Sequence, residues 1–201
     1  MRFWAKTILF NVGVGYRVRY EAMLQKGKTY VICANHTSYI DTPLTYLAVP
    51  YYFHFMGKAE LTKIPLFRIF FQKMNIPVDR SSITASHKAF LRAASDLEQG
   101  ISIAIFPEGT IHDNAPKLNR FKNGPFRLAI DKKVAILPIT FMNNWEVLPE
   151  GRKSKNGGRP GMLNIIVHKP IETENLKLSD LESLKNQVFD TIDKTLRESS
   201  N

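Results

Sequence analysis

The sequence has a single cysteine and no long apolar run, and each shortage excludes a class of protein. With only Cys33, the chain cannot hold an internal disulfide framework or a metal site built from several cysteines, which fits a reducing compartment. A membrane-spanning helix needs about 20 consecutive apolar residues. In the N-terminal region such runs are interrupted by Arg2, Lys6, Asn11, Arg17 and Arg19. We therefore expect neither a membrane span nor a cleaved secretory signal.

Acidic residues are also scarce. The chain has 28 Lys and Arg against 18 Asp and Glu, a net charge of +10, and 44% of its 201 residues are hydrophobic. This composition is typical of one folded globular domain rather than of a disordered chain. The excess of positive charge predicts an anionic partner. Nucleic acid, a phospholipid surface and phosphorylated small molecules are the candidates.

The first 27 residues differ from the rest in charge and in apolar pattern. Residues 1–28 contain six cations, and Glu21 is the one acidic residue among them. Five apolar residues recur at the spacing of an α-helix. They are Phe3, Trp4, Ile8, Leu9 and Val12. A short amphipathic helix of this kind either lies in a membrane interface or packs on the core of its own domain. The cations favour the membrane, so we predict a membrane-associating segment at residues 1–27 and one domain at residues 28–201.

From residue 28 onward, short apolar runs alternate with longer helical patterns. This alternation predicts an α/β fold with a mixed, mostly parallel sheet and helices on both faces. The expected strands are Thr29–Ala34, Tyr52–Met56, Asn75–Asp79, Ile101–Phe106, Val134–Thr140 and Leu163–His168. The expected helices are Thr42–Ala48, Lys63–Lys73, Thr84–Glu98, Gly124–Asp131 and Leu178–Leu196. Ser179 and Glu182 form a capping-box pattern at the start of the last helix.

His36 and Asp41 follow the first buried strand and are five positions apart. On a straight α-helix this offset is about 140°, which would keep the two side chains apart. A strand-to-helix bend brings them together, and the residues from Asp41 to Pro43 form a helix-start pattern. Asp41 can then accept a hydrogen bond from one imidazole nitrogen. The other nitrogen is left free to act as a general base at the sheet edge.

A second polar turn, Phe-Pro-Glu-Gly-Thr at 106–110, follows another apolar strand. The backbone N–H groups and the hydroxyl of such a turn can contact a phosphate, because its glycine permits close approach of the backbone. An ordinary strand-to-loop turn is the alternative interpretation. Four cations near expected strand ends or this turn can bind phosphate at the same edge, although each alone is typical of a solvated surface. They are Lys58, Arg80, Arg120 and Lys122.

Together and in this order, the motifs resemble those of the glycerophospholipid acyltransferases, specifically the 1-acyl-sn-glycerol-3-phosphate acyltransferases. The family's Asn-His-x4-Asp block matches Asn35–Asp41, and its Phe-Pro-Glu-Gly-Thr block matches Phe106–Thr110. Its second region is similar to Gly57–Pro65 and Ile76–Arg80, and its fourth block to Val134–Pro138. The resemblance covers about residues 28–170, and four blocks in register are far more specific than a single motif.

The resemblance implies that His36, oriented by Asp41, removes the proton from the free hydroxyl of lysophosphatidic acid. The oxygen then attacks an acyl thioester carried by coenzyme A or acyl carrier protein, which gives phosphatidic acid. Because a thioester is already activated, the reaction needs no cofactor, metal or protein nucleophile, and Cys33 is interpreted as core packing. The residues implied to bind the acceptor are Lys58, Arg80, Glu108, Gly109, Thr110 and Lys122.

Two features depart from the family's pattern. The family usually continues Glu-Gly-Thr with Arg, whereas this chain has Ile111, so a lyso-aminolipid or lysocardiolipin is the alternative acceptor. Members frequently carry membrane helices before the first block, but only 35 residues precede His36. Peripheral attachment to an anionic membrane, at the cytoplasmic face of the cell membrane, is therefore expected.

The rival class is a basic module that binds nucleic acid or membrane and has no enzymatic activity. The net charge of +10 would supply its electrostatic footprint. Against it, the sequence shows no nucleic-acid-binding signature, and its basic residues are spread along the chain.

Overall fold

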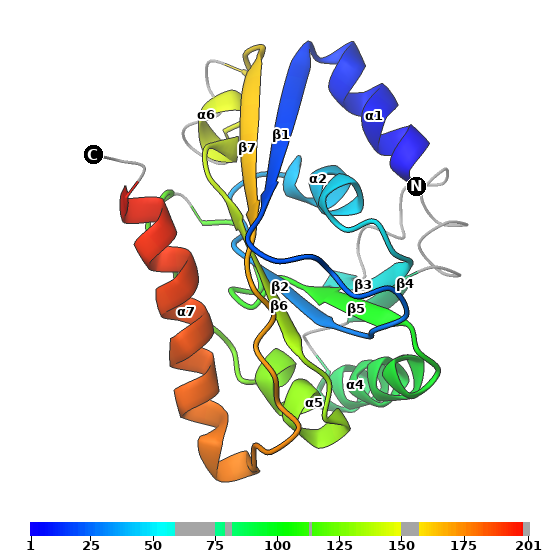
Figure 1. The fold of residues 1–201 in the computed structure, drawn as a ribbon. Coiled ribbons are helices and arrows are strands. Elements are labelled where there is room, and N and C mark those ends of the chain that lie inside the picture. Colours follow the sequence, from blue (N-terminus) through cyan, green and yellow to red (C-terminus); the bar gives the residue numbers. More distant parts are fainter. Residues whose placement is uncertain (59–74, 79–81, 113, 150–156, 199–201) are drawn as a thin grey trace.

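The computed structural model describes residues 1–58, 75–78, 82–112, 114–149 and 157–198, and the side chain of Lys58 lies outside this description. Within these residues one seven-stranded sheet has the order β1-β7-β6-β2-β5-β3-β4 (Figure 1). Neighbouring strands are parallel, except that β6 and β7 are antiparallel. The strands are β1 (Val14–Tyr20), β2 (Val31–Ala34), β3 (Phe53–Lys58), β4 (Asn75–Val78), β5 (Ser102–Ile105), β6 (Ile136–Phe141) and β7 (Gly161–Val167). The helices are α1 (Arg2–Asn11), α2 (Asp41–Ala48), α4 (Ile83–Glu98), α5 (Gly124–Lys132), α6 (Asn144–Val147) and α7 (Leu181–Glu198).

The predicted fold class is confirmed, with two additions and one correction. All six expected strands are present, and their bounds differ from the expected ones by at most two residues. Strand β1 and the short helix α6 were not expected, and the helix expected at Lys63–Lys73 lies outside the described residues. The capping box predicted at Ser179 is wrong. Instead the Asp180 carboxylate accepts a hydrogen bond from the Lys177 N–H (2.8 Å), in a 3₁₀ turn that precedes α7.

The centre of the sheet is formed by strands with no exposed residue. Every residue of β2 and β6 is buried, and Val31 of β2 lies between Ile103 of β5 and Ile136 of β6. Parallel strands of this kind need cover on both faces. Figure 1 shows α1 and α2 on one face and α4, α5 and α7 on the other. The residues that follow β2 are therefore held near the middle of the sheet, at the edge where its parallel strands end.

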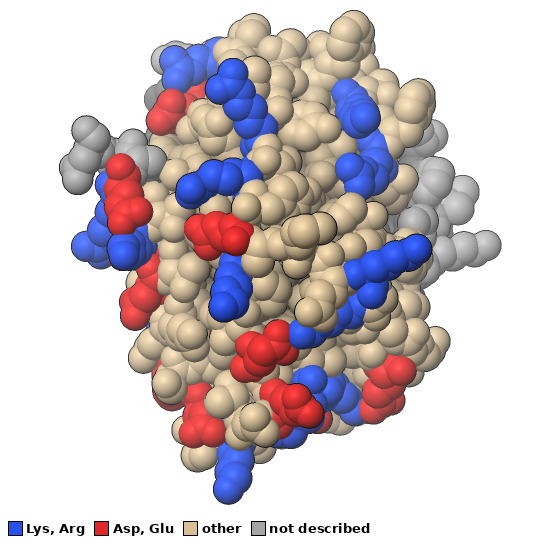
Figure 2. Space-filling view, viewed as in Figure 1, with Lys and Arg blue, Asp and Glu red and all other residues tan. Residues whose placement is uncertain are grey.

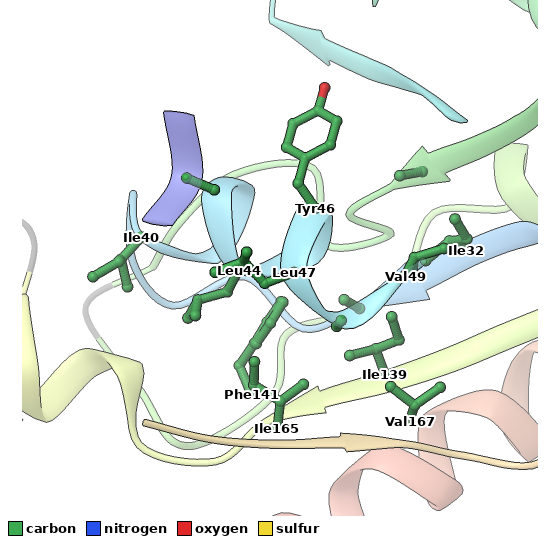
Figure 3. Close-up of a cluster of buried hydrophobic side chains, with 14 of the residues drawn as sticks. Ile32, Ile40, Leu44, Tyr46, Leu47, Val49, Ile139, Phe141, Ile165 and Val167 are labelled. Atoms are coloured by element: carbon green, nitrogen blue, oxygen red, sulfur yellow. The ribbon is translucent and has the colours of Figure 1, made fainter. Parts of the chain in front are cut away.

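Helix α2 is anchored by its apolar residues. Leu44 and Leu47 are 0% and 2% exposed, and Figure 3 shows them beside Phe141 of β6 and Ile165 of β7. Burying a leucine side chain stabilises a fold by roughly 1.5–3 kcal/mol. The packing fixes the helix axis, and with it the position of Asp41 at the first turn.

Helix α1 has apolar residues on two sides. Ala5 and Leu9 are buried and α1 packs against α2, while Phe3 and Phe10 are 85% and 84% exposed. The helix expected from the spacing of the apolar residues is therefore present, with Leu9 on its packed side and Phe3 on its exposed side. Within the described residues, none of the helices combines the length and apolar character that crossing a bilayer requires. Residues 14–20, also part of the N-terminal segment, pair with β7 as the edge strand β1.

Candidate active site

The bend after β2 is set by Asn35, whose side chain is fully buried. Its Nδ2 donates to the Phe141 carbonyl (3.0 Å), and its Oδ1 accepts from the Phe141 N–H (2.8 Å). This reciprocal pair satisfies the backbone at the end of β6 and ties it to the end of β2. The chain then turns away from the sheet, as the sequence predicted. His36 follows directly, with 16% of its side chain exposed.

Asp41 is the centre of the hydrogen-bond network. It is 0% exposed, and its Oδ2 accepts from His36 Nδ1 (2.9 Å) and from the N–H groups of Thr37 (2.7 Å) and Ser38 (2.9 Å). Its Oδ1 accepts from Asn144 Nδ2 (2.6 Å). The predicted contact between His36 and Asp41 is therefore present. A carboxylate accepts and does not donate, so Nδ1 carries the ring proton and the neutral ring has its lone pair on Nε2.

The plane of the His36 ring is fixed by stacking. The ring of Phe106 lies parallel to it, with centroids 3.9 Å apart and an interplanar angle of 4°. Phe106 in turn contacts Phe55 of β3 (5.5 Å between centroids). The hydrogen bond at Nδ1 and this stacking together leave the ring one orientation, which is the preorganisation that a general base needs.

Glu108 joins the two predicted motifs. Its Oε1 accepts from the His36 N–H (2.8 Å), and its Oε2 accepts from the N–H (3.0 Å) and Nδ2 (3.3 Å) of Asn119. Burial raises the pKa of Glu108, and the hydrogen bonds from Asn119 and the His36 backbone act in the opposite direction. At 5% exposure, its carboxyl group holds the backbone of His36 to the loop after β5.

Gly109 and Lys122 lie next to each other beside this motif. Gly109 has φ +81°, and a Cβ at this position would lie 2.8 Å from Cε and Nζ of Lys122. The turn is closed by the Lys122 N–H, which donates to the Pro107 carbonyl (2.9 Å). Thr110 is exposed at the same turn. Glycine is therefore favoured by the left-handed backbone conformation, and the end of the Lys122 side chain lies over it.

The structure gathers most, but not all, of the predicted site residues. His36, Asp41, Glu108, Gly109, Thr110 and Lys122 belong to the turns after β2 and β5 and the loop that packs on them. Lys58 ends β3 at the same edge, paired with Val78 of β4, but its side chain is not described. Arg80 lies outside the described residues.

Three residues of the site were missed by the sequence analysis. Asn144, Asn119 and Phe106 respectively hold Asp41, Glu108 and the ring of His36. Phe106 was within a recognised motif but had no assigned role. The two asparagines are 103 and 11 residues from their partners, and neither belongs to a motif, so no local signal identifies them.

Comparisons with known proteins match this chain to acyltransferases. Residues 15–142 match the family model described as Acyltransferase. The chloroplastic 1-acyl-sn-glycerol-3-phosphate acyltransferase of Arabidopsis thaliana is 32% identical over 142 residues, 70% of this chain and 39% of that protein. The enzyme of the same name from Borreliella burgdorferi is 29% identical over 202 residues, 98% of this chain and 77% of that protein.

The crystal structure of a 1-acyl-sn-glycerophosphate acyltransferase from Thermotoga maritima has the same fold. The TM-score is 0.84 at 22% identity, over 99% of this chain and 78% of that one. The chain spans about two fifths of the length of the plant and algal relatives that it matches.

Proposed function

The chain belongs to the acyltransferase family, and from that premise we propose that it transfers an acyl chain from a thioester donor to the free hydroxyl of lysophosphatidic acid. The product is phosphatidic acid, and the donor is acyl-coenzyme A or acyl carrier protein. The single observation that carries the proposal is the contact between His36 Nδ1 and Asp41 (2.9 Å), which leaves Nε2 available as a base. The names of the relatives support lysophosphatidic acid as the acceptor.

In the proposed reaction, His36 Nε2 takes the proton of the acceptor hydroxyl while the oxygen attacks the thioester carbonyl. The tetrahedral intermediate collapses, the carbon–sulfur bond breaks, and the imidazolium returns the proton to the leaving thiolate. Asp41 stabilises the imidazolium that forms between these steps. The thioester is already activated, so the chemistry needs no metal or prosthetic group.

No protein nucleophile is invoked, and the one cysteine is unsuited to that role. Cys33 lies within β2 at 0% exposure, and burial raises the pKa of its thiol. A thiol of this kind stays protonated and packs as a small apolar group. This agrees with the interpretation of Cys33 as core packing.

The acceptor's phosphate is assigned to the turn after β5. The exposed Lys122 covers Gly109, and Thr110 is exposed beside it, so a cation and a hydroxyl are presented at the edge that carries His36. Lys58 and Arg80 are the further candidates along the chain. A phosphate held there would have the Lys122 ammonium and the Thr110 hydroxyl as partners.

Lys122→Gln is expected to raise KM for lysophosphatidic acid about tenfold and to leave KM for the acyl donor unchanged, because a charge-assisted contact to phosphate is lost. Steady-state kinetics on mixed micelles measure both constants. Lys117→Gln is the matched control, since Lys117 is an exposed lysine of the same loop. Equal KM values in the wild type and the Lys122 variant would remove Lys122 from the acceptor site. Faster transfer to a lyso-aminolipid or lysocardiolipin would reassign the acceptor.

The proposed membrane contact is the outer face of α1, which would place the enzyme peripherally on the cytoplasmic face of an anionic membrane. Phe3 and Phe10 are seven residues apart, so helical geometry places them on one side, next to Lys6. Exposed aromatic residues flanked by cations are typical of helices that lie in the interface. Lysophosphatidic acid resides in that interface, so attachment brings the site to its acceptor.

Replacing both Phe3 and Phe10 by alanine is expected to weaken binding to anionic vesicles by at least about tenfold, because two apolar side chains no longer enter the interface. Sedimentation with vesicles of phosphatidylglycerol and phosphatidylcholine measures this. Ile83→Ala on α4, which also removes an exposed apolar side chain (91%), is expected to bind like the wild type. Unchanged binding of the double variant would exclude α1 as the contact.

A further inference from the structure

A groove lies over the sheet at the end away from β4. Its volume is about 1050 Å³, and it is formed by β1, β7, the chain after β6, α6 and Pro116 of the loop after β5. The lining residues that matter here are Arg17, Arg19, Met142, Trp145, Asn164 and Ile166. In Figure 2, Lys and Arg are more frequent than Asp and Glu in the upper half of the view, whereas both kinds of side chain are mixed in the lower half.

The groove is lined by cations, an aromatic ring and several apolar side chains. Arg17 and Arg19 are two residues apart on β1, so their side chains point to the same face, opposite Asn164 and Ile166 of β7. Both arginines are exposed, and Arg19 Nη2 lies 4.0 Å from Oε1 of the exposed Glu21. Glu146 also lines the groove, but its carboxylate is paired with Arg159 (3.3 Å). Guanidinium groups bind phosphates and stack on aromatic rings, and the indole of Trp145 offers a surface to a planar base.

The position of the groove matches the needs of a reaction between two anionic substrates. His36 follows β2, the central strand. The acceptor candidates belong to β5, β3 and the loop after β5, whereas the groove is formed mostly by β6, β7 and β1 on the other side of β2, with Pro116 from that loop. Helix α6 joins the groove to the catalytic pair, because Asn144 donates to Asp41 and the next residue, Trp145, lines the groove.

We propose that this groove binds the nucleotide part of coenzyme A, with the phosphates on Arg17 and Arg19 and the adenine against Trp145. The inference rests on the proposed function, which requires a phosphate-bearing acyl donor to approach His36. The volume of the groove corresponds to that of small-molecule sites, roughly 300–1,000 Å³. A groove of this size with an aromatic ring in its wall fits the nucleotide of coenzyme A better than it fits the surface of acyl carrier protein, which is the other donor considered.

The direct test is calorimetric titration of the purified protein with free coenzyme A and, separately, with adenosine 3′,5′-bisphosphate and with pantetheine. The double variant Arg17→Gln/Arg19→Gln is expected to bind coenzyme A and the bisphosphate about tenfold or more weakly, because the phosphates lose charged partners. Pantetheine binding is expected to stay unchanged. Arg92→Gln, at an exposed arginine of α4, is the matched control, and Arg17→Lys/Arg19→Lys is expected to restore part of the affinity.

Kinetics separate this proposal from the proposed function. In the double variant, KM for acyl-coenzyme A is expected to rise while kcat and KM for lysophosphatidic acid stay the same. Wild-type affinity for coenzyme A in the double variant would overturn the groove assignment and leave the acyl transfer standing. Transfer from acyl carrier protein alone, with no binding of coenzyme A, would also overturn it. Loss of coenzyme A binding in the double variant, without acyl transfer by the wild type, would keep the groove and contradict the function.

Discussion

His36→Ala is expected to lower kcat for acyl transfer by about 10²–10⁴, the usual contribution of a positioned general base. The fold should persist. Asp41 keeps three of its four hydrogen-bond donors, and the backbone N–H of residue 36 still donates to Glu108.

His112→Ala is the control for that variant. His112 follows the Glu-Gly-Thr turn at the position after Ile111, so it tests whether another histidine near the turn contributes. The initial rate of product formation and the thermal unfolding midpoint should be measured for both variants. Near-normal turnover by a folded His36→Ala protein would contradict the mechanism.

Asp41→Asn is expected to lower kcat by about 10², because electrostatic support for the imidazolium is lost while the geometry is kept. The amide oxygen can still accept from His36 and from the Thr37 and Ser38 N–H groups. The amide nitrogen would face Asn144, whose buried Oδ1 has no hydrogen-bond partner among the described residues. Rotation of the Asn144 amide lets that oxygen accept the new hydrogen bond, so stability should change little.

Asn144→Ala is the companion to this variant. It removes one neutral donor from Asp41 and leaves the charge, so we expect about a tenfold loss in kcat and a stability loss of about 1–3 kcal/mol. The thermal unfolding midpoint of each variant distinguishes a loss of catalysis from a general loss of structure. Full activity in Asp41→Asn would exclude an electrostatic role.

The contact between His36 and Asp41 was predictable because the sequence signals for it lie within a few residues of each other. His36 and Asp41 are five residues apart, and the apolar run before them and the helix start after them indicate the bend that brings them together. Asn144 was not predictable, because it reaches Asp41 only through the packing of β6 beside β2. The same is true of Asn119, which depends on how the loop after β5 folds back.

The N-terminal region shows how two periodic signals compete. Val14, Tyr16, Val18 and Tyr20 alternate with polar or small residues, which is the pattern of a strand with one covered face. The helical pattern just before it and the cations within it led the sequence analysis to treat residues 1–27 as one segment. What makes residues 14–20 a strand is the partner β7, about 150 residues away in the chain, with Val14 opposite Gly161.

The central claim is that the acceptor hydroxyl, activated by His36, attacks the thioester directly. The most direct measurement is the product formed by wild-type protein on anionic vesicles containing lysophosphatidic acid, with long-chain acyl-coenzyme A or acyl carrier protein as donor. Mass spectrometry should detect phosphatidic acid and one free carrier thiol per product, with no acyl group attached to the enzyme during turnover. A folded, vesicle-bound protein that forms no phosphatidic acid with either donor, or one that accumulates an acyl-enzyme, would contradict the account.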